Sequence, residues 1–226
     1  MHVLGIETSC SVCSVGLVDD EALIVEQNIV DPHVHSEKLL TLVEEVLERG
    51  DVGLGDLDAI AVSIGPGSFT GLRIGLSTAK GLCFSLERKL IEIPTFDAVA
   101  HVARDSTRTA DRIVIVVDAK QGEFYCGSIE MKRMGDATSM TVHTCRADDI
   151  PWKEYSDQST VWITDSPEII RTHGVPPQLT CEYSSFCRGD AVAHLARAKY
   201  GRNEFADLAL IEPRYLKDFI VKTSVT

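Results

Sequence analysis

The side chains with the clearest chemical potential lie where predicted strands end. Glu7, Thr8 and Ser9 follow the first apolar run, and hydroxyl and backbone N–H groups in such a turn can hold phosphate oxygens. Asp118 ends the β-branched run at 113–117, a position typical of a ligand for a nucleotide-bound metal. Each group also fits an ordinary polar turn. From the residues alone, phosphate binding and simple turn formation both remain open.

A glycine-rich segment at 65–75 joins a predicted buried strand to a predicted helix. It matches neither of the common phosphate-loop patterns, G-x-x-x-x-G-K-[ST] and G-x-G-x-x-G, although the start of the helix would attract anions. Within the helix, small residues recur every four positions, at Gly71, Gly75 and Ala79. Such spacing lets a second backbone approach closely. That backbone could belong to the protein's own sheet or to another protein.

Other catalytic and metal-binding motifs are missing from the sequence. Cys10-x-x-Cys13 has no second pair for a zinc site and lies between two predicted strands. No histidines are spaced i, i+4, no G-x-S-x-G marks a nucleophile, and the histidines at 101, 143, 173 and 194 are scattered. The seven cysteines, without an export signal, predict reduced thiols in the cytoplasm.

The apolar pattern predicts two related α/β lobes joined near 106–111, each opening with a strand, a tight turn and a return strand. Predicted strands of the first half are 3–9, 13–18, 22–30, 57–64 and 90–93. Its predicted helices are 36–50, with Ser36 as N-cap, 70–86 and 95–105. The second half has predicted strands at 113–118, 124–131, 140–146 and 161–164, and helices at 168–172 and 191–200. Residues 213–217 are expected to form a C-terminal tail that is anchored to the rest of the protein.

The charge of the chain limits its partners. It carries 22 Lys and Arg against 34 Asp and Glu, a net charge of −12, and most of the excess acid lies before residue 111. A protein that binds the phosphate backbone of a nucleic acid or an anionic membrane needs clustered cations. The composition therefore argues against unaided nucleic-acid binding and against a membrane-surface role.

Taken together, these motifs resemble the TsaB (YeaZ) family. The matching segments are Ile6-Glu7-Thr8-Ser9, His35-Ser36-Glu37-x-Leu39-Leu40, the whole of 65–75, Asp118-Ala119-x-x-Gly122-Glu123-x-Tyr125 and Pro213-x-Tyr215-Leu216. The resemblance implies an α/β, two-lobed actin/Hsp70/sugar-kinase-like (ASKHA) fold in which each lobe is a mixed sheet with flanking helices. It implies an N-terminal lobe at 1–106, which carries the partner-binding helices, and a C-terminal lobe at 107–226.

The resemblance also implies a function. The family supplies a non-catalytic scaffold or dimerisation subunit to the cytoplasmic complex that forms N6-threonylcarbamoyladenosine at position 37 of tRNA. The catalytic paralogue TsaD binds its metal through His-x-x-x-His, which this chain lacks. The implied partners are TsaD, in a heterodimer, the ATPase TsaE on that heterodimer, and tRNA through the complex. A homodimer of the isolated chain is a further expectation, and no cofactor, metal or membrane is expected.

The resemblance places the partner interface on helices of the first lobe. Its expected residues are Ser36, Leu39, Leu40, Val43, Thr70, Gly71, Leu72, Arg73, Gly75, Leu76, Ala79 and Lys80. Glu7, Thr8, Ser9 and Asp118 are expected to be vestigial phosphate-site positions. Two alternatives remain at this stage, an ATPase or kinase of the same fold and a peptidase acting on TsaD.

Overall fold

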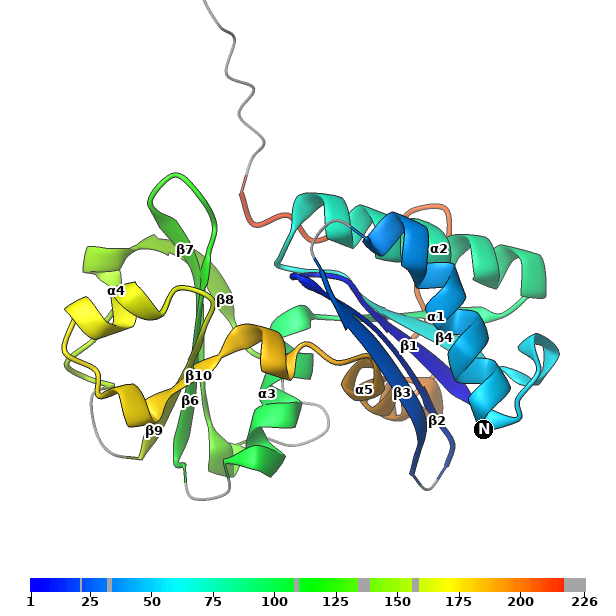
Figure 1. Cartoon of the computed structure of the whole chain (residues 1–226), viewed down its shortest axis with the longest axis horizontal. Helices are drawn as coiled ribbons and strands as arrows, with labels where there is room; N and C mark the ends of the chain where they lie inside the picture. The colour runs from blue at the N-terminus through cyan, green and yellow to red at the C-terminus, as the bar shows by residue number, and fades with distance from the viewer. Residues whose placement is uncertain (21, 32–33, 108–109, 134–138, 156–158, 218–226) are drawn as a thin grey trace, which may run out of the picture.

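Two five-stranded mixed sheets form the core in a computed structural model, which describes residues 1–20, 22–31, 34–107, 110–133, 139–155 and 159–217 (Figure 1). The first sheet has the order β3-β2-β1-β4-β5, with bounds Val3–Glu7 (β1), Val12–Val18 (β2), Leu23–Val30 (β3), Ala59–Ser63 (β4) and Lys89–Ile93 (β5). The second has the order β10-β9-β6-β7-β8, with bounds Arg112–Asp118 (β6), Glu123–Glu130 (β7), Val142–Arg146 (β8), Thr160–Thr164 (β9) and Thr180–Glu182 (β10). The predicted two-lobed α/β architecture is confirmed.

The two sheets repeat one topology. In the first, β1 pairs antiparallel with β2 and parallel with β4. In the second, β6 pairs antiparallel with β7 and parallel with β9. The β1–β2 and β6–β7 connections therefore occupy equivalent places, each at the carboxyl end of a central strand.

Helices cover both faces of each sheet (Figure 1). Because successive strand residues point to opposite faces, alternate apolar residues of one strand enter different cores. Leu4 and Ile6 of β1 face α1 and α2, whereas Val3 lies in the core that contains α5. In the second lobe, Ile113 and Ile115 of β6 pack with α3, and Val114 and Val116 with α4. The helix bounds are His35–Gly50 (α1), Phe69–Leu86 (α2), Thr95–Ser106 (α3), Pro167–Thr172 (α4) and Gly189–Gly201 (α5).

Helix α5 lies directly on the backbone of the first sheet. A Cβ atom at Gly5 would be 2.1 Å from the carbonyl oxygen of Gly189, and one at Gly16 would be 2.3 Å from the amide nitrogen of Asp190. No side chain fits at these distances. The two strand glycines therefore set how closely the C-terminal helix approaches the N-terminal sheet.

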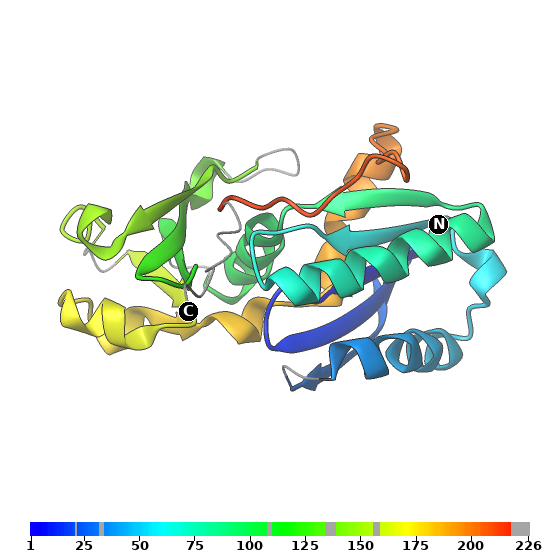
Figure 2. The same ribbon diagram turned by 90° about the horizontal axis from the view of Figure 1, so that it is seen from above.

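The predicted lobe boundaries, 1–106 and 107–226, leave one sheet on each side, but two helices pack across them. Helix α3 precedes the boundary yet packs on the second sheet, and α5 follows it yet packs on the first. The tail after α5 also returns to the first lobe, where the N–H of Arg214 donates to the carbonyl of Ile64 at 2.7 Å (Figure 2). The physical reason is an exchange: the helix after each lobe's fifth strand covers the other lobe's sheet.

Some local predictions differ from the structure. Helix α1 begins at His35 with Val34 as N-cap, so Ser36 is an exposed residue of the first turn and not the cap. Strand β10 was not predicted, because three residues are too few to show a period. Among the described helices, none is long and apolar enough to cross a bilayer.

Helix α2 packs against the β1–β2 connection through its glycines. The hydroxyl of Thr8 donates to the carbonyl of Gly71 at 2.8 Å. A Cβ at Gly71 would lie 2.0 Å from the Thr8 carbonyl oxygen, and one at Gly75 would lie 2.2 Å from Thr8 Oγ1. The small-residue face of α2 is therefore occupied by the protein's own chain.

We expect Gly75→Ala to lower the free energy of unfolding by about 1–3 kcal/mol, because the added methyl group would overlap Thr8 Oγ1. Gly81→Ala on the same helix is the matched control. Its Cβ would meet open space, so the variant should gain up to about 1 kcal/mol from helix propensity. Urea unfolding measures both values. Equal stability of the two variants would show that close packing is not what requires glycine at 75.

Candidate functional site

A cleft of about 1020 Å³ lies between the two lobes. Residues 9–11 of the β1–β2 connection and 118–121 of the β6–β7 connection both line it, together with the start of α2 and the C-terminal tail. The equivalent turns of the two lobes thus border one cleft. Of the four expected phosphate-site positions, Ser9 and Asp118 line the cleft, whereas Glu7 and Thr8 are buried and do not line it.

Glu7 sits in a buried polar cluster. One carboxylate oxygen, Oε1, accepts the N–H of Ser9 at 2.6 Å, while Oε2 has no hydrogen-bond partner among the described residues. The hydroxyls of Ser9, Ser63 and Tyr183 are also buried without a partner in this part of the structure. Burial raises the pKa of Glu7, and the nearby Ser9 and Ser63 offset only part of that effect. The uncharged carboxyl group is therefore favoured here.

Asp118 is held by its own turn. Its Oδ1 accepts the backbone N–H of Lys120 and its Oδ2 accepts the Lys120 ammonium group, both at 2.7 Å. Its own N–H donates to Oδ1 of Asp165 at 2.9 Å. Burial alone would raise the pKa of Asp118, but the bonds from Lys120 outweigh it and hold the pKa below its usual range. The turn is strained, because Lys120 and Gln121 have φ of 65° and 61°.

The C-terminal tail bridges the two lobes across the cleft (Figure 2). The hydroxyl of Tyr215 accepts from Arg73 Nε at 2.9 Å, and its ring lies 5.0 Å from that of Phe69 at the start of α2. The ammonium group of Lys217 lies 2.6 Å from Glu123 and donates to the Lys120 carbonyl at 3.0 Å in the second lobe. The sequence predicted an anchored tail, but this bridge depends on contacts distant in sequence and had no signal there.

The cleft has little spare positive charge. Within the described residues, the two lysines that line it, Lys120 and Lys217, are paired with Asp118 and Glu123. No group of three or more His, Cys, Asp or Glu side chains in this part of the chain is arranged to hold a metal ion. The cleft therefore offers hydroxyl and backbone groups to a ligand, whereas its two lysines already form ion pairs within the chain.

Cys10 and Cys13 lack the features of a reactive dithiol. Cys13 is fully buried, and burial raises the pKa of its thiol to about 11. A reactive thiol needs a lowered pKa and access to solvent. The expectation of ordinary reduced cysteines agrees with this environment, since all seven cysteines are free in the structure.

The structure buries most residues of the predicted partner interface. Seven of them are buried in the protein's own core, namely Leu39, Val43, Gly71, Leu72, Gly75, Leu76 and Ala79. They fill the space between the helices and the first sheet, so no partner can reach them. Lys80 is half-buried and donates to the carbonyl of Ile211 at 3.3 Å. The exposed members of the set are Ser36, Leu40, Thr70 and Arg73.

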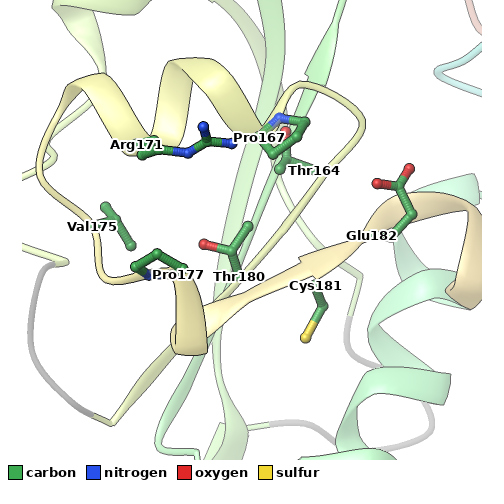
Figure 3. A pocket seen from close by; sticks show the side chains of 8 residues that line it. All are labelled: Thr164, Pro167, Arg171, Val175, Pro177, Thr180, Cys181 and Glu182. Carbon is green, nitrogen blue, oxygen red and sulfur yellow. The ribbon is translucent and has the colours of Figure 1, made fainter.

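A second, smaller pocket of about 280 Å³ lies within the second lobe (Figure 3). Arg171 and Pro167 of α4 line one side, and Thr180 and Cys181 of β10 line the other. The guanidinium of Arg171 pairs with Glu168 at 3.1 Å. None of the residues that the sequence singled out for binding lies in this pocket.

The buried carboxyl group of Glu7 predicts a pH dependence of stability. Its pKa is raised above the ordinary value of 4.5 in the folded protein, so folding favours the protonated form. Its favourable contribution is fully present below the unfolded pKa and is lost as pH rises through the folded pKa. We therefore expect Glu7→Gln to become more stable relative to the wild type as pH rises from about 4 to about 8.

Urea unfolding across that pH range measures the difference, with the exposed α1 substitution Glu45→Gln as the matched control. If Glu7→Gln and Glu45→Gln show the same pH dependence relative to the wild type, the folded pKa of Glu7 is not raised.

Comparison with known proteins places this geometry in a family. The model of the family described as TsaD, tRNA N6-adenosine threonylcarbamoyltransferase, matches residues 30–153, which is more than half of the chain. The tRNA threonylcarbamoyladenosine biosynthesis protein TsaB of Escherichia coli is 29% identical over 164 residues, covering 73% of this chain and 70% of that protein.

Solved structures agree on the fold. YeaZ from Pseudomonas aeruginosa superposes with a TM-score of 0.78 at 24% identity, covering 95% of this chain and all of that one. The activator of 2-hydroxyisocaproyl-CoA dehydratase from Clostridium difficile, with bound ADPNP, superposes with a TM-score of 0.50 at 7% identity, covering 92% and 99%. These likenesses confirm the two-lobed ASKHA-like fold. The chain belongs to the family that the matching model describes and, within it, to the TsaB (YeaZ) proteins.

Proposed function

We propose that this chain is a non-catalytic subunit of the machinery that forms N6-threonylcarbamoyladenosine at position 37 of tRNA, where it binds and supports the catalytic paralogue TsaD. The names of its relatives support the pathway. One structural observation carries the proposed role. The outer face of α2 is lined by small exposed residues, and no packing within the described chain accounts for their small size. The protein acts in the cytoplasm, with TsaE joining the heterodimer and tRNA contacted through the complex.

The outer face of α2 differs from the face that the sequence indicated. Ser77, Gly81 and Ser85 are exposed and lie four residues apart, so they share one side of the helix. A Cβ at Gly81 would meet no atom within 4 Å, although glycine in a helix costs about 1 kcal/mol relative to alanine. Gly71 and Gly75 are explained by Thr8, and Gly81 is not. A partner helix packed against the stripe formed by Ser77, Gly81 and Ser85 would account for the glycine at position 81.

Large apolar side chains lie exposed on the same helix pair. Phe84, next to the stripe, is 80% exposed, and Leu40 of α1 is 56% exposed. Exposed aromatic and aliphatic groups of this size typically anchor protein interfaces. Acidic side chains occupy the outer face of α1, at Glu37, Glu44, Glu45 and Glu48, and they favour a basic partner surface over a second copy of this chain. A homodimer would therefore form only when TsaD is absent.

The cleft supports a non-catalytic role. Its lysines are paired within the chain, and the tail spans it from α2 to the β6–β7 turn. A phosphate group that bound through these lysines would have to displace Asp118 or Glu123 from them. The contacts across the cleft thus serve to hold the two lobes together.

An ATPase or kinase is the second candidate, and the cleft itself favours it. Its volume of about 1020 Å³ is at the upper end of the usual range for ligand pockets, and the turns of both lobes border it. Calorimetric titration of the isolated protein with Mg-ATP decides between the two. Micromolar binding supports the enzyme, and no heat of binding supports the scaffold.

We expect Gly81→Trp to weaken TsaD binding by at least about tenfold, because the indole ring would hold the partner helix away from α2. Gly201→Trp is the matched control, since Gly201 is also open but lies at the end of α5 on the other side of the first sheet. Binding is measured by titrating TsaD, and urea unfolding checks that both variants are folded. Wild-type affinity of a folded Gly81→Trp variant would contradict the proposed interface.

A further inference from the structure

Two histidines that looked scattered in the sequence come together in the structure. His101 of α3 and His194 of α5 have ring centroids 5.6 Å apart. They line a pocket of about 560 Å³ with Arg104 of α3 and Arg197 of α5. This pocket shares no lining residue with the cleft, and it contains no residue of the proposed partner face.

Two copies of one four-residue sequence pattern, His-x-Ala-Arg, contribute to the pocket. Helix α3 carries His101-Val102-Ala103-Arg104, and α5 carries His194-Leu195-Ala196-Arg197. In each, the histidine and arginine are three residues apart and therefore share a face, while the alanine is buried. Helices α3 and α5 follow the fifth strands of their respective sheets, so they are equivalent elements of the two lobes. The exchange of these helices brings both copies of the pattern to one place.

The charges in the pocket favour an anion. The Nε atom of Arg104 lies 3.5 Å from Asp105, which leaves its terminal nitrogens in no ion pair within the described chain. Arg197 donates to the backbone carbonyl of Asp20, which is a neutral acceptor. The Asp20 carboxylate pairs with the amino group of Met1 at 2.7 Å. Two guanidinium groups, two imidazoles and the Met1 amino group therefore line the pocket, against the two carboxylates of Asp20 and Asp105, in a chain whose net charge is −12.

We propose that this pocket binds a phosphate group. Guanidinium groups match the oxygen spacing of phosphate and can bind it through two parallel hydrogen bonds each. The imidazoles supply further N–H donors from both helices. The chemistry fits a free phosphate or a phosphate of an RNA backbone, and it does not depend on the proposed pairing with TsaD.

Proton uptake accompanies binding. Burial, then the charges of Arg104 and His194, lower the pKa of His101, and the charges of Asp105 and Asp190 oppose this only in part. Arg197 adds a further positive charge from α5, and Asp20 is already paired. The negative charge of a bound anion opposes these positive charges and raises the pKa of the His101 ring. Binding of an anion is therefore coupled to protonation of His101.

The experiment titrates the whole protein with sodium phosphate and follows the imidazole resonances of His101 and His194 by NMR, with sodium chloride at matched ionic strength as the reference. We expect saturable shifts with phosphate that chloride does not produce. The double variant Arg104→Gln/Arg197→Gln should bind at least about tenfold more weakly. Arg171→Gln, on α4 and outside this pocket, should bind as the wild type does. Circular dichroism verifies that each variant is folded.

A second arm uses a short single-stranded RNA oligonucleotide in place of phosphate. If the oligonucleotide shifts the same resonances and phosphate competes with it, the ligand is a backbone phosphate. Shifts with inorganic phosphate alone identify a small phosphate ligand. The proposal is overturned if neither probe gives a saturable shift in the wild type, or if the folded double variant binds with unchanged affinity. These readouts are independent of TsaD, so a failure here leaves the proposed function intact.

Discussion

The contact between Thr8 and helix α2 is the constraint on which the rest of the structure depends. The Thr8 hydroxyl donates to Gly71, and Gly75 lies against the same oxygen. This contact places the start of α2 beside the β1–β2 connection, and the N–H of Ser68 donates to the Ser9 carbonyl at 2.7 Å. It thereby fixes one wall of the cleft, directs the remaining face of α2 to solvent, and positions Phe69 and Arg73 to receive the tail.

The charged side chains around the cleft form contacts within the chain. Glu7 is buried with its pKa raised, Asp118 holds Lys120, and Glu123 holds Lys217. Each carboxylate that could contribute to a nucleotide site instead completes an intramolecular contact. The proposed partner surface lies instead on the outer face of α2, where small residues and Phe84 are exposed. The proposed partner surface is thus separate from the cleft, because the charged side chains of the cleft already have partners within the chain.

Much of this could be predicted from the sequence, and the exceptions have physical causes. Local period and turn residues located nine of the ten strands and the five α-helices, and β10 was missed because its pairing with β9 is long-range. The every-fourth-residue spacing on α2 correctly indicated close packing. It could not identify which backbone approaches, since Thr8 is 63 residues from Gly71. The His101–His194 pair was missed for the same reason, because nothing local signals that α3 and α5 exchange lobes.

The exchange of helices has a consequence for how the chain is made. Strand β5 completes the first sheet at Ile93, but the helix that covers its second face begins at Gly189. At a synthesis rate of 5–20 residues per second, the sheet waits on the order of 5–20 s for that helix. During that interval the strip of backbone around Gly5 and Gly16 is open to other strands or to chaperones. The N-terminal half is thus complete in sequence well before it is complete as a folded unit.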